Sequence, residues 1–570
     1  MKRRKFLHNL PLLGAFPFAI SGMPMRAMAS DRPLQRLAAM SDNDRVLIIL
    51  ELNGGNDGIN TLIPVDNYDL YYFRRPNIAI PARNSARRFI PLDNTLPLPD
   101  QVGLHPDMLG LKQLYDEAKV RIIQGVSYEN NNGSHFRGRD ILFMGGGYND
   151  YLGSGWVGRF LEDNYAPQLY PDDFPNAQME DPLALEFGND ISLIFHQTNN
   201  IPTSISINNP NQFFNLVEEL EGFEDLEGVD PRGVPPAVLN NSPYGQELNW
   251  ILGLEQKSDD YAARLKTLYD IGDAIQTNVV YPETYPFSAP GGSSRNPLAG
   301  QMQIIAKLLS GGCKTKVFLV RMGGFDTHAE QVSTFDPTMG VHAALLYHIS
   351  ATMKAFQDDL KARGLEDRVL TMTTSEFGRR IFSNGSYGTD HGSGAPMFLF
   401  GKWVNPGVLG TNPDLNQGNV GQQFDYRQIY ASILKDWFEV GADLVDGGAP
   451  DESIIRGDYE GRGITLPLIN TNTVTSITSF INDRFRLYPC YPNPAVDKTT
   501  MRFYINTPTT VTLEVLNSQG KVVKTVLKNE MKDAGEHRLM VNLKGLPPGF
   551  YIYRIEAGLL RDTRKLLIYR

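Results

Sequence analysis

The segment Val46–Gly58, with the sequence VLIILELNGGNDG, decides the fold class. Its first five residues form a continuous apolar run, which is typical of a strand in a mostly parallel sheet. The run leads into a polar, glycine-rich turn that contains Asp57. Open α/β sheets bind their ligands just beyond the carboxyl ends of their strands, so this turn is a candidate site element.

The same pattern recurs through residues 42–468, where apolar runs alternate with segments of helical periodicity, such as Leu109–Ala118 and Leu345–Leu360. Three further apolar runs are each followed by a polar loop, and one more run is preceded by a polar loop. These runs are Val120–Ile123, Val317–Val320, Val369–Met372 and Met397–Phe400. With the turn after Leu50, this makes five polar loops. The alternation predicts an α/β domain with a mostly parallel sheet flanked by helices.

Carboxylates and imidazoles are concentrated in these five loops. They are Asp57, His135, Asp326, His328, Glu376, Asp390 and His391. Such side chains bind divalent cations, and adjacent glycines allow the backbone to turn sharply around an ion. If the loops meet at one edge of the sheet, we expect a metal site there, with zinc favoured and manganese or iron as alternatives.

Each loop also has a simpler interpretation when taken alone. Asp326 and His328 could be a turn followed by a surface histidine, and Glu376 could stand at the start of a helix, where the helix dipole favours an acidic residue. Ser134 could cap a helix that begins at His135. The joint placement of five such loops favours the metal site.

Composition excludes several classes of function. The chain has 570 residues and a net charge of -10, without a basic block in its middle, so nucleic acid is not an expected partner. After the N-terminus no apolar stretch is long enough to span a bilayer, so we expect no transmembrane segment in the mature protein. The two cysteines, Cys313 and Cys490, do not indicate a disulfide framework.

The first 29 residues have the three parts of an export signal. Lys2–Lys5 is basic, Leu10–Ile20 is largely apolar, and Ala27-Met28-Ala29 is a cleavage site with a small residue at each end. Arg3 and Arg4 resemble the twin-arginine motif, which implies the twin-arginine translocase as a partner. An ordinary secretory signal is the alternative.

The C-terminus changes character after a polar linker, placed at residues 469–487. Short runs of alternating apolar residues, separated by turn signals, follow from Met501 to Tyr569 and predict a small β-sandwich over residues 488–570. The segments Tyr491–Pro494, Leu546–Tyr551 and Lys565–Tyr569 resemble the type A sorting domain of the type IX secretion system. This resemblance implies the type IX secretion machinery as a partner and delivery, through the periplasm, to the cell surface or the medium. A carbohydrate-binding or adhesive sandwich is the alternative.

The middle of the chain resembles the domain-of-unknown-function 1501 family, which is placed with the alkaline-phosphatase-like metalloenzymes. The resemblance lies in Leu52–Gly58, Ser134–Phe136, Gly324–His328, Ser375–Arg379 and Thr389–Gly392. It implies an alkaline-phosphatase-like fold over residues 42–468. It also implies metal ligands among the loop residues and a nucleophile at a helix N-terminus.

Carried over to this sequence, the resemblance assigns Asp326 with His328, and Asp390 with His391, to two metal-binding pairs. Asp57 and Glu376 complete the predicted ligands, and Ser134 with His135 is assigned to catalysis. The chain departs from the superfamily in two places: Glu51–Asn53 stands where an aspartate is usual, and no histidine lies between His391 and the tail.

The predicted function is an exported metal-dependent hydrolase of phosphate or related anionic esters. A sulfatase-like hydrolase is less favoured, because the Cys/Ser-x-Pro/Ala-x-Arg segment is absent around Ser134. The alternative from another class is a surface binding protein that retains the fold without turnover.

Overall fold

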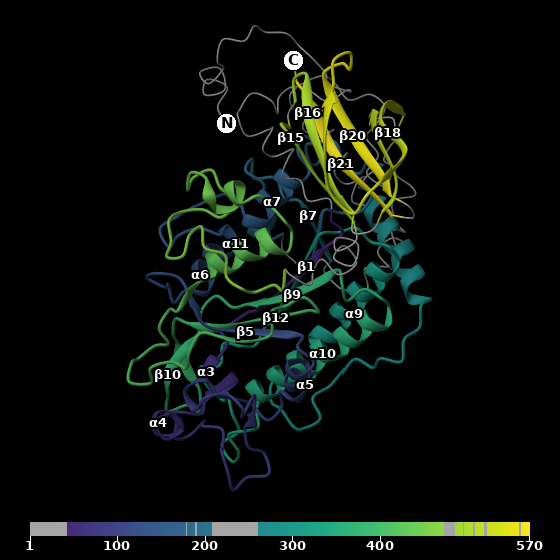
Figure 1. Ribbon diagram of the computed structural model, residues 1–570. Coiled ribbons are helices and arrows are strands. Elements are labelled where there is room, and N and C mark those ends of the chain that lie inside the picture. Colours follow the sequence, from purple (N-terminus) through teal and green to yellow (C-terminus); the bar gives the residue numbers. More distant parts are fainter. Residues whose placement is uncertain are drawn as a thin grey trace, which may run out of the picture. The chain divides into compact units, whose positions relative to one another are not determined.

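The computed structural model describes residues 43–177, 179–188, 191–207, 260–471, 485–493, 495–505, 508–517, 521–557 and 560–569 (Figure 1). These residues form two compact units, which divide between Ile469 and Asn470. The predicted signal of residues 1–29 and most of the predicted linker lie outside the described residues. None of the described helices combines the length and the apolar character needed to cross a membrane.

The first unit is built on a nine-stranded sheet in the order β13-β5-β12-β9-β1-β8-β6-β7, with β14 beside β5. The strands are β1 (Val46–Leu52), β5 (Val120–Ser127), β6 (Ala184–Phe187), β7 (Ser204–Ile207), β8 (Val317–Met322), β9 (Val369–Thr374), β12 (Ala395–Phe400), β13 (Gly407–Leu409) and β14 (Phe424–Asp425). β12 is antiparallel to both of its neighbours, whereas the other pairings are parallel. The predicted mostly parallel α/β sheet is confirmed.

The central strand β1 explains why its sequence is a continuous apolar run. It pairs with β8 on one side and β9 on the other, and all seven of its residues are buried. Ile48 and Leu50 belong to the core on one face of the sheet, whereas Leu47 and Ile49 are buried outside that cluster. A strand covered on both faces cannot alternate between apolar and polar residues.

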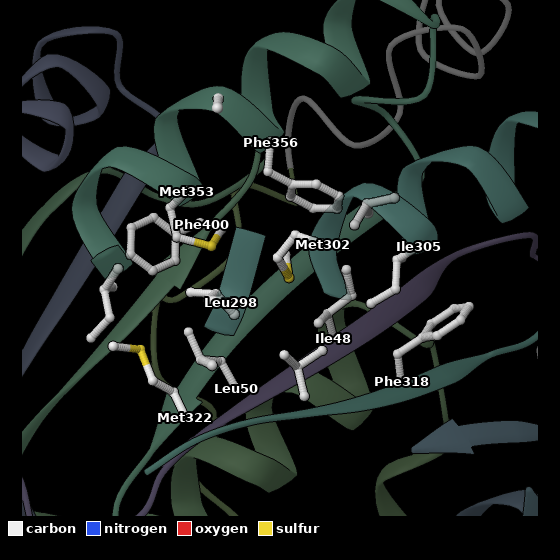
Figure 2. Packing of buried hydrophobic residues seen from close by; sticks show 14 of the residues in the cluster. Ile48, Leu50, Leu298, Met302, Ile305, Phe318, Met322, Met353, Phe356 and Phe400 are labelled. Atoms are coloured by element: carbon white, nitrogen blue, oxygen red, sulfur yellow. The ribbon is translucent and has the colours of Figure 1, made fainter. Parts of the chain in front are cut away.

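Helices cover both faces of this sheet (Figure 1). α5 (Leu109–Asp116), α9 (Pro297–Ser310) and α10 (Val341–Ala362) lie on one face, and α6 (His135–Met144), α7 (Trp156–Asn164) and α11 (Tyr426–Asp436) lie on the other. Figure 2 shows the first interface, where Ile48 and Leu50 lie close to Leu298 and Met302 of α9. Each such side chain contributes about 1.5–3 kcal/mol through burial.

The first unit also contains several shorter helices and strands. The helices α3 (Gly58–Thr61) and α4 (Tyr68–Arg74) contact β10 (Arg379–Ser383), which forms a hairpin with β11 (Thr389–His391). The remaining elements are β2 (Leu62–Pro64), β3 (Ile90–Pro91), β4 (Val102–Leu104), η2 (Leu98–Asp100), η3 (Leu193–Phe195) and η4 (Asp443–Gly447).

The second unit consists of two antiparallel sheets, in the orders β15-β16-β19 and β18-β17-β20-β21. Phe503, Val515 and Tyr553 come from both sheets and belong to one buried cluster. Its strands are β15 (Phe485–Tyr491), β16 (Lys498–Ile505), β17 (Thr509–Asn517), β18 (Val522–Lys532), β19 (Gly535–Asn542), β20 (Gly549–Ala557) and β21 (Leu560–Ile568). The predicted small β-sandwich is therefore observed.

Candidate metal centre

The five loops singled out in the sequence belong to five neighbouring strands, β5, β12, β9, β1 and β8. Four of them follow the carboxyl ends of strands that run in the same direction. The fifth, Gly388–Gly394, precedes β12, but β12 is antiparallel to its neighbours. Its amino end therefore lies at the same edge as the carboxyl ends of the others, and all five loops meet there.

Three side chains converge at this edge, and His328 lies beside two of them. His135, Asp326 and His391 each offer a ligand atom within 4.8 Å of the others. Asp326 Oδ2 lies 3.5 Å from His135 Nε2, and Asp326 Oδ1 lies 3.3 Å from the Nε2 atoms of both His391 and His328. Two ligands bound at about 2.0–2.1 Å in tetrahedral geometry are roughly 3.3 Å apart, so this spacing suits one cation.

The hydrogen bonds of the other ring nitrogens assign the tautomers. His135 Nδ1 lies 2.7 Å from Glu376 Oε1, and His391 Nδ1 lies 2.7 Å from the carbonyl oxygen of Gly133. Both partners are acceptors, so each neutral ring donates through Nδ1 and keeps a lone pair on Nε2. His328 Nδ1 lies 3.4 Å from Asp390 Oδ1.

The consequence is that imidazole lone pairs and a carboxylate face one another. His328 Nε2 and His391 Nε2 are 2.8 Å apart. The contacts of His135 with Glu376 and of His391 with Gly133 are typical of metal sites, where a carboxylate or carbonyl oxygen accepts a hydrogen bond from the histidine nitrogen that does not bind the metal. A cation between the ligand atoms of His135, Asp326 and His391 would bind all three, with His328 next to it.

Phe377 and Gly54 pack against the residues of the cluster on the protein side. The buried Phe377 ring has its centroid 4.9 Å from that of His135 and 4.5 Å from that of His391. The Gly54 N–H donates to Glu376 Oε1 over 2.8 Å. Gly54 has a φ of +120°, and a Cβ there would lie 2.2 Å from the Asp326 nitrogen, so only glycine fits.

Arg379 organises the loops from inside the protein. Its side chain is fully buried and donates to the carbonyl oxygens of Gly55, Phe325 and Thr389, and to Asp326 Oδ1 over 2.6 Å. Burial raises the pKa of the Asp326 carboxyl, but the hydrogen bond and charge of Arg379, together with His391 and His135, outweigh burial, and the pKa lies below its usual value. Asp326 therefore remains an anion.

The remaining predicted ligands lie behind the cluster or away from it. Glu376 contacts His135 and Asp390 contacts His328, so both support a histidine. Asp57 is fully buried, with its Oδ2 atom 2.6 Å from Arg75 Nη1. After Gly54 the backbone turns into the interior of the protein. The structure therefore does not bring Asp57 to the cluster.

Ser134 and His135, assigned to catalysis from the sequence, occupy different positions. His135 belongs to the converging set, which makes it a candidate ligand. Ser134 is exposed at the N-terminus of α6, and its side chain makes no capping hydrogen bond. Sequence reasoning missed Arg379, although the basic residue that follows Gly378 after a strand was a signal of it.

Two family models match the chain. Residues 285–443 match the model described as "Protein of unknown function (DUF1501)", and residues 489–569 match the "Secretion system C-terminal sorting domain". No curated protein matches the chain at a significant level.

Several solved structures are similar at low identity. A protein in the alkaline phosphatase superfamily from Vibrio parahaemolyticus is 11% identical, with a TM-score of 0.33, over 90% of this chain and 92% of its own. A sulfatase from Pseudoalteromonas sp. is 11% identical, with a TM-score of 0.28, over 90% and 86%. An alkaline phosphatase from the Antarctic bacterium TAB5, in a variant with magnesium bound, is 12% identical, with a TM-score of 0.23, over 70% and 98%.

Identities and TM-scores as low as these say nothing about the activity of this chain. The family models are the firmer finding: the first lies within the first unit and covers three of its five motif loops, and the second covers most of the second unit. Residues 285–443 are therefore similar to the DUF1501 family, and residues 489–569 match the secretion system C-terminal sorting domain, which implies secretion or delivery to the cell surface.

Proposed function

We propose that this protein is a metal-dependent hydrolase of phosphate or related anionic esters. The observation that carries the proposal is the convergence of three imidazole Nε2 atoms on the Asp326 carboxylate. Two imidazole nitrogens and a carboxylate oxygen, with a third imidazole beside them, suit zinc, with manganese or iron as alternatives. A divalent cation held there supplies Lewis-acid stabilisation of the charge that develops on the ester oxygens.

Exposure favours a catalytic ion over a structural one. The side chains of Asp326 and His328 are 49% and 46% exposed. Structural zinc sites are closed, whereas catalytic sites keep a position open to water or substrate. An ion held by these residues would lie within reach of a substrate in solvent.

Two further features fit an anionic substrate. Ser134 lies beside His135 at the N-terminus of α6, where the free N–H groups and the helix dipole favour an anion. Arg380 is exposed. The pKa of Asp390 is lowered mainly by hydrogen bonds from Asn384 and His328, and the positive charge of Arg380 lowers it further. In this proposal Arg380 binds the substrate's anionic group, and the Ser134 hydroxyl or a water molecule bonds to the phosphorus or sulfur atom as that atom's bond to the alcohol oxygen breaks. The proton of the attacking group passes to the leaving alcohol, and where Ser134 attacks, water then hydrolyses the ester formed on Ser134.

Metal analysis and a substrate screen test the proposal together. We expect the purified protein to hold about one equivalent of zinc and to hydrolyse at least one of p-nitrophenyl phosphate, bis-p-nitrophenyl phosphate and p-nitrophenyl sulfate. His391→Ala should lose both metal and activity. His196→Ala is the matched control, because His196 is a histidine that bonds to Asn200, outside the cluster.

The outcomes separate the alternatives. Metal without turnover of any ester would favour the surface binding protein, with the ion in a structural role. Turnover restricted to the sulfate ester would favour the sulfatase-like alternative. Wild-type protein that takes up no metal, even after incubation with zinc, manganese and iron, would refute the metal centre itself.

Export is proposed to begin with the twin-arginine translocase and to end with the type IX machinery. The first step rests on Arg3 and Arg4 and on the apolar run that follows them. Replacing both arginines with lysine keeps the charge, so it should block only a route that reads the motif. Normal export of that variant would assign the chain to the general secretory route.

A further inference from the structure

A small cavity lies next to the candidate metal centre. Glu376, Phe377, Asn131, Ser127 and Tyr128 are among its lining residues, and its volume is about 20 Å³. A single water molecule needs roughly 10–15 Å³ measured in this way. The cavity therefore has room for one water molecule and for little else.

Two hydrogen-bond acceptors at this cavity have no partner among the described residues. They are Glu376 Oε2 and Asn131 Oδ1, and both atoms are buried. The Glu376 side chain is 4% exposed, and its other oxygen is occupied by the Gly54 N–H and by His135. A buried acceptor left without a hydrogen bond costs about 1–3 kcal/mol, and more when it is charged.

One hydroxyl at the cavity has a hydrogen to donate. The Tyr128 oxygen accepts from the backbone N–H of Asn132 over 3.1 Å, and no acceptor for its own hydrogen is found in the described part of the chain. Other hydroxyls that line the cavity already donate to backbone oxygens. These belong to Ser127, Ser375, Ser393 and Tyr426, while the Thr374 hydroxyl lies 3.4 Å from the Tyr430 hydroxyl.

We propose that the cavity binds one water molecule, which accepts from the Tyr128 hydroxyl and donates to Glu376 Oε2 and Asn131 Oδ1. Three hydrogen bonds are typical of a buried water, and these three satisfy every free polar atom named above. The water holds the Glu376 carboxylate in the orientation that accepts from His135 Nδ1. Tyr128 and Asn131 are thus positioning residues of the metal centre, and this consequence rests on the proposed function.

The test compares Tyr128→Phe with a matched control, Tyr281→Phe. The control removes a buried tyrosine hydroxyl as well. The Tyr281 hydroxyl donates to Asp359 Oδ2 over 2.9 Å, outside the cluster. We would determine high-resolution crystal structures of the metal-free and zinc-loaded wild type and of Tyr128→Phe. The zinc dissociation constant of each protein would be measured by competition with a chelator, and its melting temperature alongside.

Wild-type crystals should show one ordered water in the cavity, and Tyr128→Phe should lose or displace it. The zinc dissociation constant should rise about tenfold in Tyr128→Phe, the lower end of what losing a supporting partner costs a metal site. Asn131→Ala, which removes an acceptor and adds space, should raise it as well. Tyr281→Phe should lower the melting temperature without changing the dissociation constant.

Three results would overturn parts of this inference. A dry cavity in the wild-type crystal would refute the water site. A change in zinc affinity no larger in Tyr128→Phe than in Tyr281→Phe would refute the positioning role. Wild-type protein without metal would refute the proposed function, and the positioning role with it, while the water density in the metal-free crystal would still decide the water site.

Discussion

Arg379 and Asp326 meet at the boundary between the interior and the solvent. Arg379 Nη2 lies 2.6 Å from Asp326 Oδ1, and the guanidinium is fully buried while the carboxylate is 49% exposed. The same guanidinium donates to carbonyl oxygens from the loops that follow β1 and β8. The pair therefore sets the position of the only carboxylate in the converging set and joins the loops around it.

The first prediction concerns this arginine. Arg379→Lys keeps the charge but replaces a planar fork of five N–H donors with one ammonium, which cannot reach all of these oxygens. We expect a loss of about 2 kcal/mol or more in the free energy of unfolding, together with weaker metal binding. Urea titration followed by tryptophan fluorescence reports on the first unit, because all four tryptophans precede residue 469.

Arg380→Lys is the control for that measurement. Arg380 is the next residue but is exposed, so its replacement should change the free energy of unfolding by no more than about 0.5 kcal/mol. Equal stability of the two variants would mean that the buried hydrogen bonds of Arg379 contribute little.

The second prediction uses the pH dependence of the buried pair of Asp57 and Arg75. Burial raises the pKa of the Asp57 carboxyl, but the charge and hydrogen bond of Arg75, together with His342 and Gln331, outweigh it, and the pKa lies below its usual value. The stabilisation is therefore complete above the unfolded pKa of about 3.9 and is lost as the pH falls through the lower folded pKa. Asp57→Asn leaves Arg75 buried without an anion, which costs about 3–5 kcal/mol at neutral pH.

The difference in unfolding free energy between wild type and Asp57→Asn should be constant from about pH 5 to 7 and should shrink below about pH 4. Metal content should be unchanged in folded Asp57→Asn, because Asp57 pairs with Arg75 rather than joining the cluster. Loss of metal from a folded variant would restore Asp57 as a ligand.

The sequence predicts the sheet and its loops well, because those signals are local. A continuous apolar run such as Val46–Leu50 indicates a strand buried on both faces, and a polar loop after it marks the edge where ligands bind. The antiparallel direction of β12 was not predicted. It depends on how Met397 and Phe398 pair with Ile123 and Ile122, more than 270 positions earlier.

The individual roles at the site were harder to predict, because each depends on a distant partner. Asp57 lies in a loop with the composition of a ligand-binding loop, but its charge is neutralised by Arg75. Its Oδ2 atom also accepts a hydrogen bond from Gln331. Glu376 has a carboxylate that could bind metal directly, yet it holds His135. Periodicity and spacing identify the loops but do not determine which side chains turn inward.

The third prediction addresses substrate binding by Arg380. Its side chain is exposed on β10, which pairs with β11, the strand that carries Asp390 and His391. Arg380→Ala should raise the KM for the best anionic ester about tenfold or more, through the loss of a charge-assisted contact, and should leave metal content unchanged. Lys402→Ala is the control, since Lys402 is a cation that pairs with Glu366 and Asp367 instead. An unchanged KM would remove Arg380 from the binding site.

The fourth prediction concerns the C-terminal unit. The buried cluster of the β-sandwich is made by its own strands, so each unit has a core of its own. Deleting residues from Tyr488 onward should leave the first unit folded, with unchanged tryptophan fluorescence and metal content, but retained in the periplasm. Cell fractionation would check this, and normal surface delivery of the truncated protein would refute the role of the tail in sorting.

The last prediction separates a nucleophile from a helix cap. If Ser134 attacks the ester, Ser134→Ala should abolish turnover and retain the full metal content, because a nucleophile is not needed to hold an ion. His391→Ala should instead lose both. The Ser134 side chain makes no capping hydrogen bond, so its removal should change stability by less than the roughly 1 kcal/mol that the loss of a cap costs.

Metal content, turnover and the midpoint of urea unfolding, measured on wild type, Ser134→Ala and His391→Ala, distinguish these possibilities. A Ser134→Ala protein that is destabilised by about 1 kcal/mol but hydrolyses the ester normally would identify Ser134 as a cap. Normal turnover with unchanged stability would leave a water molecule as the attacking group. Loss of turnover with metal and stability intact is the result we expect, since Ser134 combines an exposed hydroxyl, a helix N-terminus and a neighbouring histidine of the cluster.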